Sequence, residues 1–399
     1  MIRDLISILF ALFVFIIDSI FAFLYKKNTN SIKCNRLFLV IHQAGIGDYI
    51  LFRNFIEIIK NSKKYKEYKI TLLGNIDWKD IAENLDYEYV EKYIWIDSNK
   101  FRKNLVYRYN KFKEILANSN KVVICPTYSR SLSSDNIVKV LSAKNKIGSI
   151  GDCSNIKIWQ KKISDKYYTK LIPQKKGLLF EFYRNKEFFE NLLETKLDIK
   201  KTFIKLKNKK MGFGLPQNYV VLFVGARARF RKWDVKNFVK IAKYIKKKYN
   251  LDIILCGGST DIEDVNEFQK YFFKDSIKYK QGDYIDLVGK TSLIDLIYVI
   301  SNGNLMIANE TSAPHFAVAL GINTLVISNG NHFGRFTPYP KEMTDKYHVI
   351  YHPEIEKDLD NYKKLSSSYG YKSKLDINEI SVKSVLEKVD NILEVTRTT

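Results

Sequence analysis

Cysteine is scarce in this 399-residue chain, and its placement follows no pattern. The four cysteines form no CxxC pair and show no zinc-binding spacing, so a zinc module is not indicated and a reducing compartment is the simpler interpretation. Cys125 and Cys256 end apolar runs, where a thiol behaves as a small hydrophobic side chain rather than as a nucleophile. No repeat of roughly 20 to 50 residues is visible, which argues against a solenoid.

Acidic residues are also few, because 43 Asp and Glu stand against 66 Lys and Arg and leave a net charge of +23. This excess favours anionic partners such as nucleotides, nucleic acids or an acidic membrane surface. No RNA or DNA recognition motif is present, so a basic nucleic-acid-binding protein is the disfavoured alternative. Hydrophobic residues make up 46% and charged residues 27%, which is typical of a folded chain, and the length predicts roughly two or three domains.

The amino-terminal segment is the one candidate for a membrane helix. Residues 5–25 carry a single charge, Asp18, and match the roughly 20 apolar residues that cross a bilayer. We therefore expect residues 1–27 to form a membrane-anchoring helix, and the excess of basic residues after it places the body in the cytoplasm. A cleaved signal peptide fits poorly, because the basic residues follow the apolar core. A helix lying in the membrane interface stays open as an alternative, since an Asp within a bilayer is costly.

The remaining sequence alternates short β-branched runs with amphipathic stretches, which predicts parallel sheets flanked by helices. We expect one α/β domain over residues 33–211 and a second over residues 212–399, the latter ending in a helix. The predicted strands of the first sheet are 36–42, 69–74, 121–126 and 146–151. Those of the second are 219–225, 251–258, 285–289, 304–309 and 323–328.

The first candidate site is the turn HQAGIGD at residues 42–48, which closes a strand and opens a helix. Its glycines permit a sharp turn with exposed amides. Ile50 stands where a dinucleotide-binding fingerprint requires its third glycine, so a nicotinamide or flavin site is disfavoured. Spacing alone favours Asp48 as a helix cap, and a general base at the carboxyl edge of the sheet is the alternative.

The second candidate is the loop GARARFRKW at residues 225–233, which holds four cations after the first strand of the second domain. A solvated basic loop is the simple interpretation. Ligands of open α/β sheets lie at the carboxyl edge, however, and clustered Arg and Lys there suit a diphosphate.

Two further loops reach the same edge. In NETSAPH, residues 309–315, the start of a helix is available to a phosphate, whereas Glu310 repels phosphate and suits a sugar hydroxyl or a cation such as Arg231. A lone His is usually structural, although His315 lies in the first helical turn of this loop. In residues 257–261 the glycines permit close approach and Asp261 suits a ribose. Three such loops predict a nucleotide.

Read in order, these segments resemble glycosyltransferase family 9, the bacterial heptosyltransferases of lipopolysaccharide assembly, over roughly residues 36–340. The motifs that carry the resemblance are QAGIGDYIL, GARARFRKWDVKNFVKIA, LVGKTSLIDLIYVI, ANETSAPHFAVALG and FGRFTPY. The resemblance implies a GT-B fold of two Rossmann-like domains facing a cleft. It also implies inverting transfer of a sugar from a nucleotide-diphosphate donor, ADP-heptose being favoured, with no obligatory metal or other cofactor.

The resemblance implies a role for individual residues as well. Asp48 is the implied general base, and the loop around it on the acceptor side comprises His42, Gln43, Gly45 and Gly47. The donor-binding set is Arg227, Arg231, Lys232, Gly257, Gly258, Ser259, Asp261, Thr291, Glu310, Thr311, Ser312 and His315. Arg231 stands where the family commonly has Lys, and Glu310 where it has Asp, so the donor sugar need not be heptose.

The implied acceptor is a lipid-linked or surface glycan such as lipopolysaccharide, or an oligosaccharide. The expected location is the cytoplasmic face of the inner membrane, against its anionic surface and held there by residues 5–25. A protein that keeps the fold and binds a nucleotide sugar without catalysis is the main alternative.

Overall fold

The computed structural model describes residues 2–27, 36–117, 120–207, 214–274 and 282–398. They form two compact units, which we call unit 1 and unit 2. Unit 1 comprises Met1–Lys176 and Tyr183–Asp198, and unit 2 comprises Gly177–Phe182 and Ile199–Thr399. The domain boundary expected between residues 211 and 212 lies outside the described residues.

Unit 1 is built on a six-stranded parallel sheet in the order β3-β2-β1-β4-β5-β6. The order reverses between β1 and β4, so the loops that follow these two strands flank a crevice at the carboxyl edge. The strands are β1 (Leu37–His42), β2 (Lys69–Asn75), β3 (Lys92–Ile96), β4 (Val122–Cys125), β5 (Asn145–Ser149) and β6 (Lys170–Ile172).

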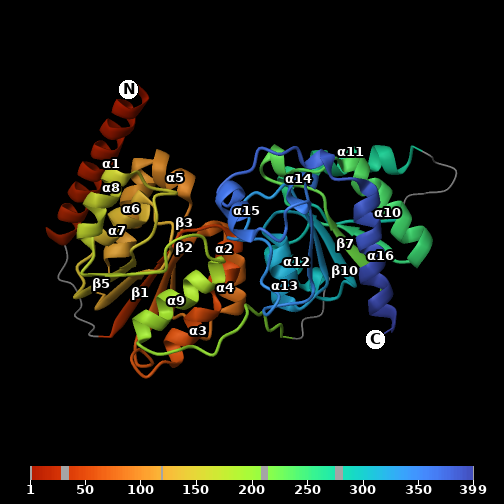
Figure 1. Ribbon diagram of the computed structural model, residues 1–399. Helices are drawn as coiled ribbons and strands as arrows, with labels where there is room; N and C mark the ends of the chain where they lie inside the picture. The colour runs from red at the N-terminus through yellow and green to blue at the C-terminus, as the bar shows by residue number, and fades with distance from the viewer. Residues whose placement is uncertain (1, 28–35, 118–119, 208–213, 275–281, 399) are drawn as a thin grey trace. The chain divides into compact units, whose positions relative to one another are not determined.

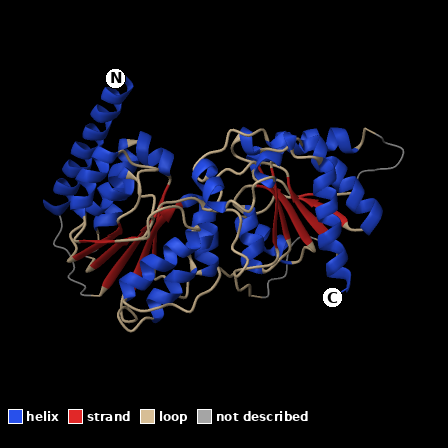
Figure 2. Cartoon of the chain, viewed as in Figure 1, coloured by secondary structure: helices blue, strands red, loops and turns tan. Residues whose placement is uncertain are grey.

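Helices cover both faces of this sheet (Figures 1 and 2). Alternate strand residues such as Leu39 and Ile41 pack with Phe112 of α6 and Ile137 of α7 on one face. On the other side of the unit, Phe189 of α9 stacks on Phe55 of α3. The helices are α2 (Ile46–Phe52), α3 (Asn54–Asn61), α4 (Lys79–Leu85), α5 (Ser98–Lys103), α6 (Leu105–Leu116), α7 (Leu132–Val140), α8 (Ile158–Ser164) and α9 (Glu181–Leu193).

Unit 2 repeats this plan with the strand order β12-β11-β10-β7-β8-β9, which reverses between β7 and β10. Its strands are β7 (Tyr219–Phe223), β8 (Asp252–Leu255), β9 (Ile285–Asp286), β10 (Leu305–Asn309), β11 (Thr324–Ser328) and β12 (Tyr347–Tyr351). The two parallel α/β sheets expected from the sequence are confirmed. β3, β6 and β12 were not predicted. All three are edge strands, and their sequences are less uniformly apolar than those of the central strands.

The helices that cover the unit 2 sheet are amphipathic, as the sequence predicted. α10 (Val235–Tyr249), α11 (Ile262–Phe272) and α16 (Val382–Thr398) pack apolar side chains against alternate residues of the sheet. Tyr219, whose neighbour Val220 belongs to that core, instead donates its hydroxyl to the Val299 carbonyl of α12. The remaining helices are α12 (Leu293–Ser301), α13 (Ala313–Leu320), α14 (Pro353–Glu356) and α15 (Tyr362–Tyr369), and short 3₁₀ turns include η3 (Arg229–Arg231) and η4 (Ser259–Asp261).

The expectation of a membrane-spanning amino-terminal helix is wrong. The segment does form a helix, α1 (Ile2–Lys27), but no helix among the described residues is long and apolar enough to cross a membrane. α1 instead contacts α6 and α7 within unit 1 (Figure 1). The side of α1 that faces α7 makes a polar contact, because Lys139 of α7 donates a hydrogen bond to the Ser19 hydroxyl at 2.9 Å. The hydrocarbon chains of a membrane could not provide such a hydrogen bond.

Asp18 is the reason for this packing. Its carboxylate is 1% exposed and receives two hydrogen bonds from Arg108 of α6, from Nε at 2.5 Å and from Nη2 at 2.6 Å. Burial raises the pKa of Asp18, and the Arg108 guanidinium opposes that shift. A buried charge is tolerated when it is paired in this way, so the residue that looked costly for a membrane helix is the one that attaches α1 to the unit.

We expect Asp18→Ala to detach α1, because it leaves Arg108 buried without its counter-charge. Breaking a buried pair by removing one partner typically costs about 3–5 kcal/mol. Hydrogen exchange should show loss of protection in α1 and α6 while β7 and β10 keep theirs. The double variant Asp18→Leu with Arg108→Leu is the control, because it removes both charges and should recover much of the protection. Equal exchange in wild type and Asp18→Ala would refute this role.

His42 ends β1 as a buried, uncharged ring. It is 2% exposed and stacks on Phe52 with ring centroids 4.3 Å apart. Burial lowers its pKa to about 3. Because the unfolded chain binds this proton at a pKa near 6.5 and the folded chain does not, stability falls as the pH drops below about 6.5.

His42→Phe keeps the stacked ring and removes the titration. We expect the wild type to lose about 2 kcal/mol relative to this variant between pH 7.5 and pH 5, which is 1.36 kcal/mol for each of roughly 1.5 pH units. Urea unfolding of both proteins at the two pH values measures the difference. A stability gap that does not change with pH would show that the ring is not held neutral.

Candidate functional site

The loops that carry most of the predicted donor residues meet at the carboxyl edge of the unit 2 sheet. β7 is followed by the basic loop, β8 by residues 256–261, and β10 by the turn into α13. β7 lies between β10 and β8, so these three loops are neighbours. The point where the strand order reverses, between β7 and β10, is where open α/β sheets bind their ligands.

Asn309 joins the loops of β10 and β7. Its side chain is fully buried and donates to the Val224 carbonyl at 2.8 Å. Its carbonyl oxygen accepts from the Trp233 amide at 3.0 Å. Both ends of the basic loop are thereby held by one side chain from the neighbouring strand.

The two adjacent cations of this loop have different surroundings. Arg231 donates from Nη1 to the main-chain carbonyl of Glu310 at 3.3 Å, and its buried Nε has no hydrogen-bond partner among the described residues. Lys232 instead binds both carboxylate oxygens of Asp264 on α11, at 2.8 and 2.7 Å. The charge of Lys232 is therefore largely compensated, whereas no carboxylate among the described residues pairs with the Arg231 guanidinium.

Glu310 is held in place by the end of β11. Its carboxylate accepts from the Ser328 hydroxyl at 2.5 Å and is 7% exposed. Of the two roles suggested for this carboxylate, holding Arg231 is not seen, because Arg231 contacts the main-chain oxygen of residue 310; binding of a sugar hydroxyl stays a prediction. Next to it, the buried hydroxyl of Thr311 has no hydrogen-bond partner within the described part of the chain.

His315 lies in the first turn of α13 and is 7% exposed. Burial lowers its pKa to about 4, so the ring is neutral at pH 7. Its Nδ1 shares a hydrogen bond with the Tyr339 hydroxyl at 2.6 Å. His315 can therefore offer a hydrogen bond to a ligand but not a positive charge. Ser312, the residue before α13, occupies the cap position.

The β8 loop packs closely against the β7 loop. Asp261 accepts a hydrogen bond from the Gly258 amide at 2.9 Å, and it is 8% exposed. A Cβ placed on Gly225 would lie 2.2 Å from the Asp261 carboxyl carbon, so only glycine fits there. Burial raises the pKa of Asp261. The Asp261 carboxylate thus stabilises the loop through its hydrogen bond with the Gly258 amide. Its expected binding to a ribose stays a prediction.

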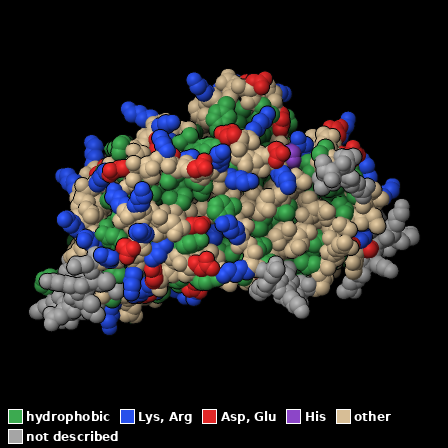
Figure 3. Space-filling model, turned by 90° about the horizontal axis from the view of Figure 1, so that it is seen from below, with side chains coloured by type: hydrophobic (Ala, Val, Ile, Leu, Met, Phe, Trp, Pro, Cys, Tyr) green, Lys and Arg blue, Asp and Glu red, His purple; other side chains and the backbone are tan. Residues whose placement is uncertain are grey.

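The other predicted donor residues lie around this edge. Gly257 and Ser259 belong to the β8 loop, and Thr291 directly precedes the cap of α12. Arg227 is exposed on the basic loop. Lys and Arg side chains are otherwise scattered over the face shown in Figure 3 and do not form a single basic patch there.

The turn of unit 1 places Asp48 at the start of α2. The cap of α2 is Gly45 and not Asp48, which the spacing had suggested; Asp48 lies inside the first turn, and its carboxylate accepts from the Gly45 amide at 3.2 Å. The next residue, Tyr49, donates its hydroxyl to the buried Asp86 carboxylate at 2.6 Å and stacks on Trp78. Gln43 accepts from the Ser134 hydroxyl at 2.9 Å. The turn is rigidly supported, and Gly47 lies within α2.

Some residues of the unit 2 edge were missing from the predicted set. Asn309 and Ser328 organise it, and Asn329 links it to the basic loop by donating to the Phe230 carbonyl at 2.9 Å. Each is a polar residue at or just after the carboxyl end of a buried strand, and that position was the available signal. Across the described residues, no group of three or more His, Cys, Asp or Glu is arranged to hold a metal ion.

Known structures share this architecture. A glycosyl transferase family 9 protein from Veillonella parvula superposes with a TM-score of 0.66 at 15% identity, covering 92% of this chain and 99% of that one. The E. coli heptosyltransferase WaaC with ADP gives 0.64 at 14%, covering 89% and 99%. The E. coli ADP-heptose lps heptosyltransferase II gives 0.62 at 14%, covering 90% and 99%. At these identities the likeness establishes the fold, and the expected GT-B-like fold with two parallel α/β units is supported.

The comparison with curated protein sequences gave no match. The family model described as glycosyltransferase family 9 (heptosyltransferase) matches residues 108–364, which is more than half of the chain and includes the loops of Arg231, Asp261 and Glu310. The chain therefore belongs to glycosyltransferase family 9, and it is a glycosyltransferase that uses a nucleotide sugar.

Proposed function

We propose that the protein transfers a sugar, with inversion, from a nucleotide-diphosphate donor to a lipid-linked or surface-glycan acceptor such as lipopolysaccharide. ADP-heptose is the favoured donor. The observation that carries the donor assignment is the joined pair of loops after β7 and β10, which presents Arg231 beside the start of α13. Two structural neighbours from E. coli, the ADP-heptose lps heptosyltransferase II and the heptosyltransferase WaaC with ADP, support the same choice of nucleotide.

The donor diphosphate fits this edge by charge and by hydrogen bonding. Arg231 supplies a guanidinium that pairs with no carboxylate among the described residues, and the amino end of α13 supplies backbone amides with a favourable dipole. As the bond to the sugar breaks, negative charge develops on the departing diphosphate. Fixed donors of this kind stabilise such charge, and removing one often costs about 3–4 kcal/mol in the transition state.

In this proposal Glu310 and His315 form hydrogen bonds with the donor sugar. The carboxylate of Glu310 is oriented by Ser328 and suits a sugar hydroxyl rather than the diphosphate, which it would repel. His315 is neutral and can hydrogen-bond without adding charge. The geometry is compatible with heptose or with another sugar, because Glu310 is one methylene longer than the Asp common in the family.

Asp48 is the proposed general base. A single displacement with inversion needs one base to accept the proton of the attacking hydroxyl as the new glycosidic bond forms. The turn around Asp48 resembles the GD-containing turn of the family, and the hydrogen bond from the Gly45 amide orients the Asp48 carboxylate. We also propose that the reaction needs no metal, since Arg231 and the helix amides supply the stabilising charge.

The location also stays a proposal. A lipid-linked acceptor would bring the enzyme to the cytoplasmic face of the inner membrane, and a net charge of +23 favours an anionic surface. α1 carries no part of this proposal.

Donor binding tests the difference between the two neighbouring cations. We expect ADP at a hundred times its Kd to stabilise the protein by about 2.7 kcal/mol, seen as a rise in Tm, whereas UDP, GDP and CMP give less. Arg231→Gln should weaken ADP binding about tenfold or more, the effect of losing one charge-assisted hydrogen bond. Lys232→Met is the matched control, because it should lower the Tm through the orphaned Asp264 and leave ADP affinity within about threefold. Equal losses in both variants would contradict the assignment.

Asp48→Asn tests the base. The amide oxygen of Asn can still accept the hydrogen bond from the Gly45 amide, so we expect the fold and ADP binding to be retained. The kcat for sugar transfer should fall by about 10²- to 10⁴-fold, the usual contribution of a general base, with the KM for the donor little changed. The assay should be run with and without EDTA. Turnover within about tenfold of wild type would remove Asp48 from this role, and a loss of turnover with EDTA would refute metal independence.

A further inference from the structure

The outer side of α1 is an apolar surface. α1 lies along the outside of unit 1 and contacts α6 and α7 with its other side (Figure 1). The side chains that it leaves in solvent, among those that the structure describes, are all large and apolar, and each is 43% to 67% exposed. We call them the outer stripe of α1: Leu9, Leu12, Phe13, Ile16, Ile20, Phe23 and Leu24. Scattered apolar residues are common on protein surfaces, whereas a set gathered on one helix marks an interaction surface.

The outer stripe has the spacing of a contact between two helices. Five of its residues follow one another at steps of four, three, four and three positions: Leu9, Phe13, Ile16, Ile20 and Phe23. Because an α-helix has about 3.6 residues per turn, residues at these steps lie on one face. The same alternation is the heptad repeat with which one helix inserts its apolar side chains between those of another. The spacing therefore indicates a second helix along the stripe.

The area of the outer stripe is sufficient for a stable interface. A large apolar side chain that is about half exposed leaves on the order of 100 Å² in contact with water. The whole stripe therefore presents about 700 Å² on one copy and about 1,400 Å² on two copies. Specific protein interfaces bury about 1,200–2,000 Å² in total. Two copies of the stripe thus supply the area that a stable dimer needs.

The charge along the stripe favours a second helix over a lipid surface. Helices that lie on anionic membranes are rich in Lys and Arg beside their apolar face. Across residues 8–24 the one charged residue is Asp18, whose carboxylate is buried and paired with Arg108. A second copy of the same stripe needs no charged residues on this surface, because two identical apolar faces complement each other.

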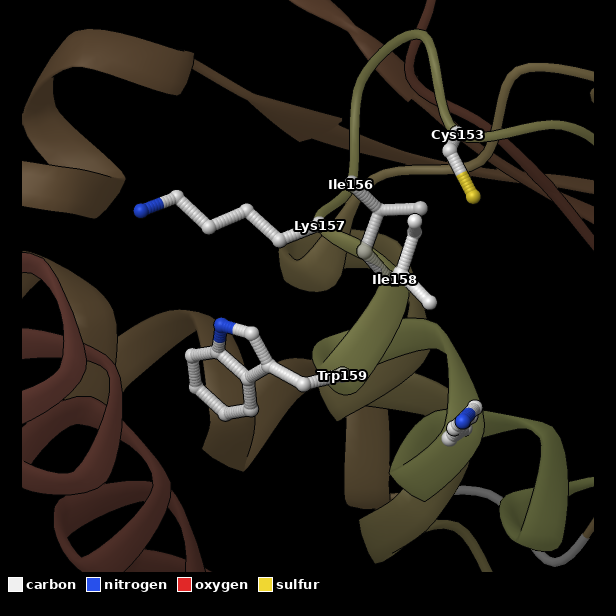
Figure 4. A pocket seen from close by; sticks show the side chains of 6 residues that line it. Cys153, Ile156, Lys157, Ile158 and Trp159 are labelled. Carbon is white, nitrogen blue, oxygen red and sulfur yellow. The ribbon is translucent and has the colours of Figure 1, made fainter. Parts of the chain in front are cut away.

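A hollow at the start of α8 offers a contrast. It has about 530 Å³ and contains Ile158, which is 65% exposed. Figure 4 shows Lys157 and Trp159 extending to the same side, with Ile156 and Ile158 lying nearer to Cys153. The exposed Lys157 interrupts the apolar lining, so this surface does not continue as a stripe. Ile158 therefore serves as a control position for the residues of the outer stripe.

We propose that two copies of this chain associate in solution through the outer stripes of their α1 helices. Both copies use the same surface, so the interface is isologous and closes as a twofold dimer rather than growing into a filament. The removal of apolar area from water drives the association. Ile16 lies in the middle of the stripe and hence near the centre of the interface. This inference goes beyond the proposed function and is independent of it, because Asp48 and the proposed donor-binding residues lie outside α1.

The test measures the oligomeric state of the full chain in buffer without detergent. We expect sedimentation equilibrium to show a dimer at micromolar concentration, and we expect the Tm to rise with protein concentration. Ile16→Glu should raise the dimer Kd at least about a hundredfold, because each copy would bury an unpaired carboxylate. Ile158→Glu makes the same change at the α8 hollow and should leave the dimer Kd within about threefold. Far-UV circular dichroism should show the wild-type fold in both variants.

A photo-crosslinker identifies what covers the stripe. Benzoylphenylalanine in place of Phe13 should crosslink two copies, and mass spectrometry should locate the crosslink within α1 of the second copy. A wild type that stays monomeric at micromolar concentration overturns the proposal, as do aggregates of undefined size. A monomer that sediments with phosphatidylglycerol vesicles only when Ile16 is intact also overturns it, because the stripe would then bind lipid. A dimer that Ile16→Glu leaves intact has its interface elsewhere and refutes the proposal.

Discussion

The reversal of strand order in a parallel sheet is the constraint on which both candidate sites depend. β7 and β10 are neighbouring strands, but the connections that follow them run to opposite faces of the sheet. The loops at the start of these connections therefore need side-chain contacts that fix their positions. In unit 2 this is done by the buried amide of Asn309, which bonds to Val224 and Trp233 on the adjacent strand and loop. Without that bridge Arg231 would sit on an ordinary surface loop. In unit 1 the hydrogen bond between Ser134 and Gln43 plays the same part between the loops of β4 and β1.

Paired buried charges position the helices around these edges. Arg53 binds both oxygens of Asp86 beneath α2, and Tyr49 adds a third hydrogen bond. Asp18 and Arg108 do the same between α1 and α6. Such pairs are weak contributors to stability compared with apolar packing, since desolvation offsets most of the attraction. They do penalise alternative placements strongly, because any shift that breaks the pair leaves a charge buried alone.

The same chemistry explains where residue-level expectations departed from the structure. Four cations in the basic loop looked equivalent along the sequence, yet Lys232 is compensated by Asp264 of α11, 32 positions away. Holding a cation such as Arg231 was one expected role of Glu310, and its carboxylate instead meets Ser328 of the next strand. Asp48 was expected at the cap of α2, and the structure places Gly45 there and Asp48 within the first turn. For Lys232 and Glu310 the partner comes from an element that local spacing does not reveal.

The sequence by itself determined the two parallel α/β units, the loops that end their central strands, and the family, because short β-branched runs and glycine-rich or basic turns are local signals. Only the tertiary structure decided which charges are compensated and where α1 packs. The hydrophobic run of residues 5–25 illustrates the division, since its composition predicts a bilayer helix, whereas contacts with α6 and α7, among them the Asp18–Arg108 pair and the packing of Phe21 on Phe112, place it on the protein instead. Long-range pairing is set by which faces meet, and that follows from sheet order and helix packing rather than from neighbouring residues.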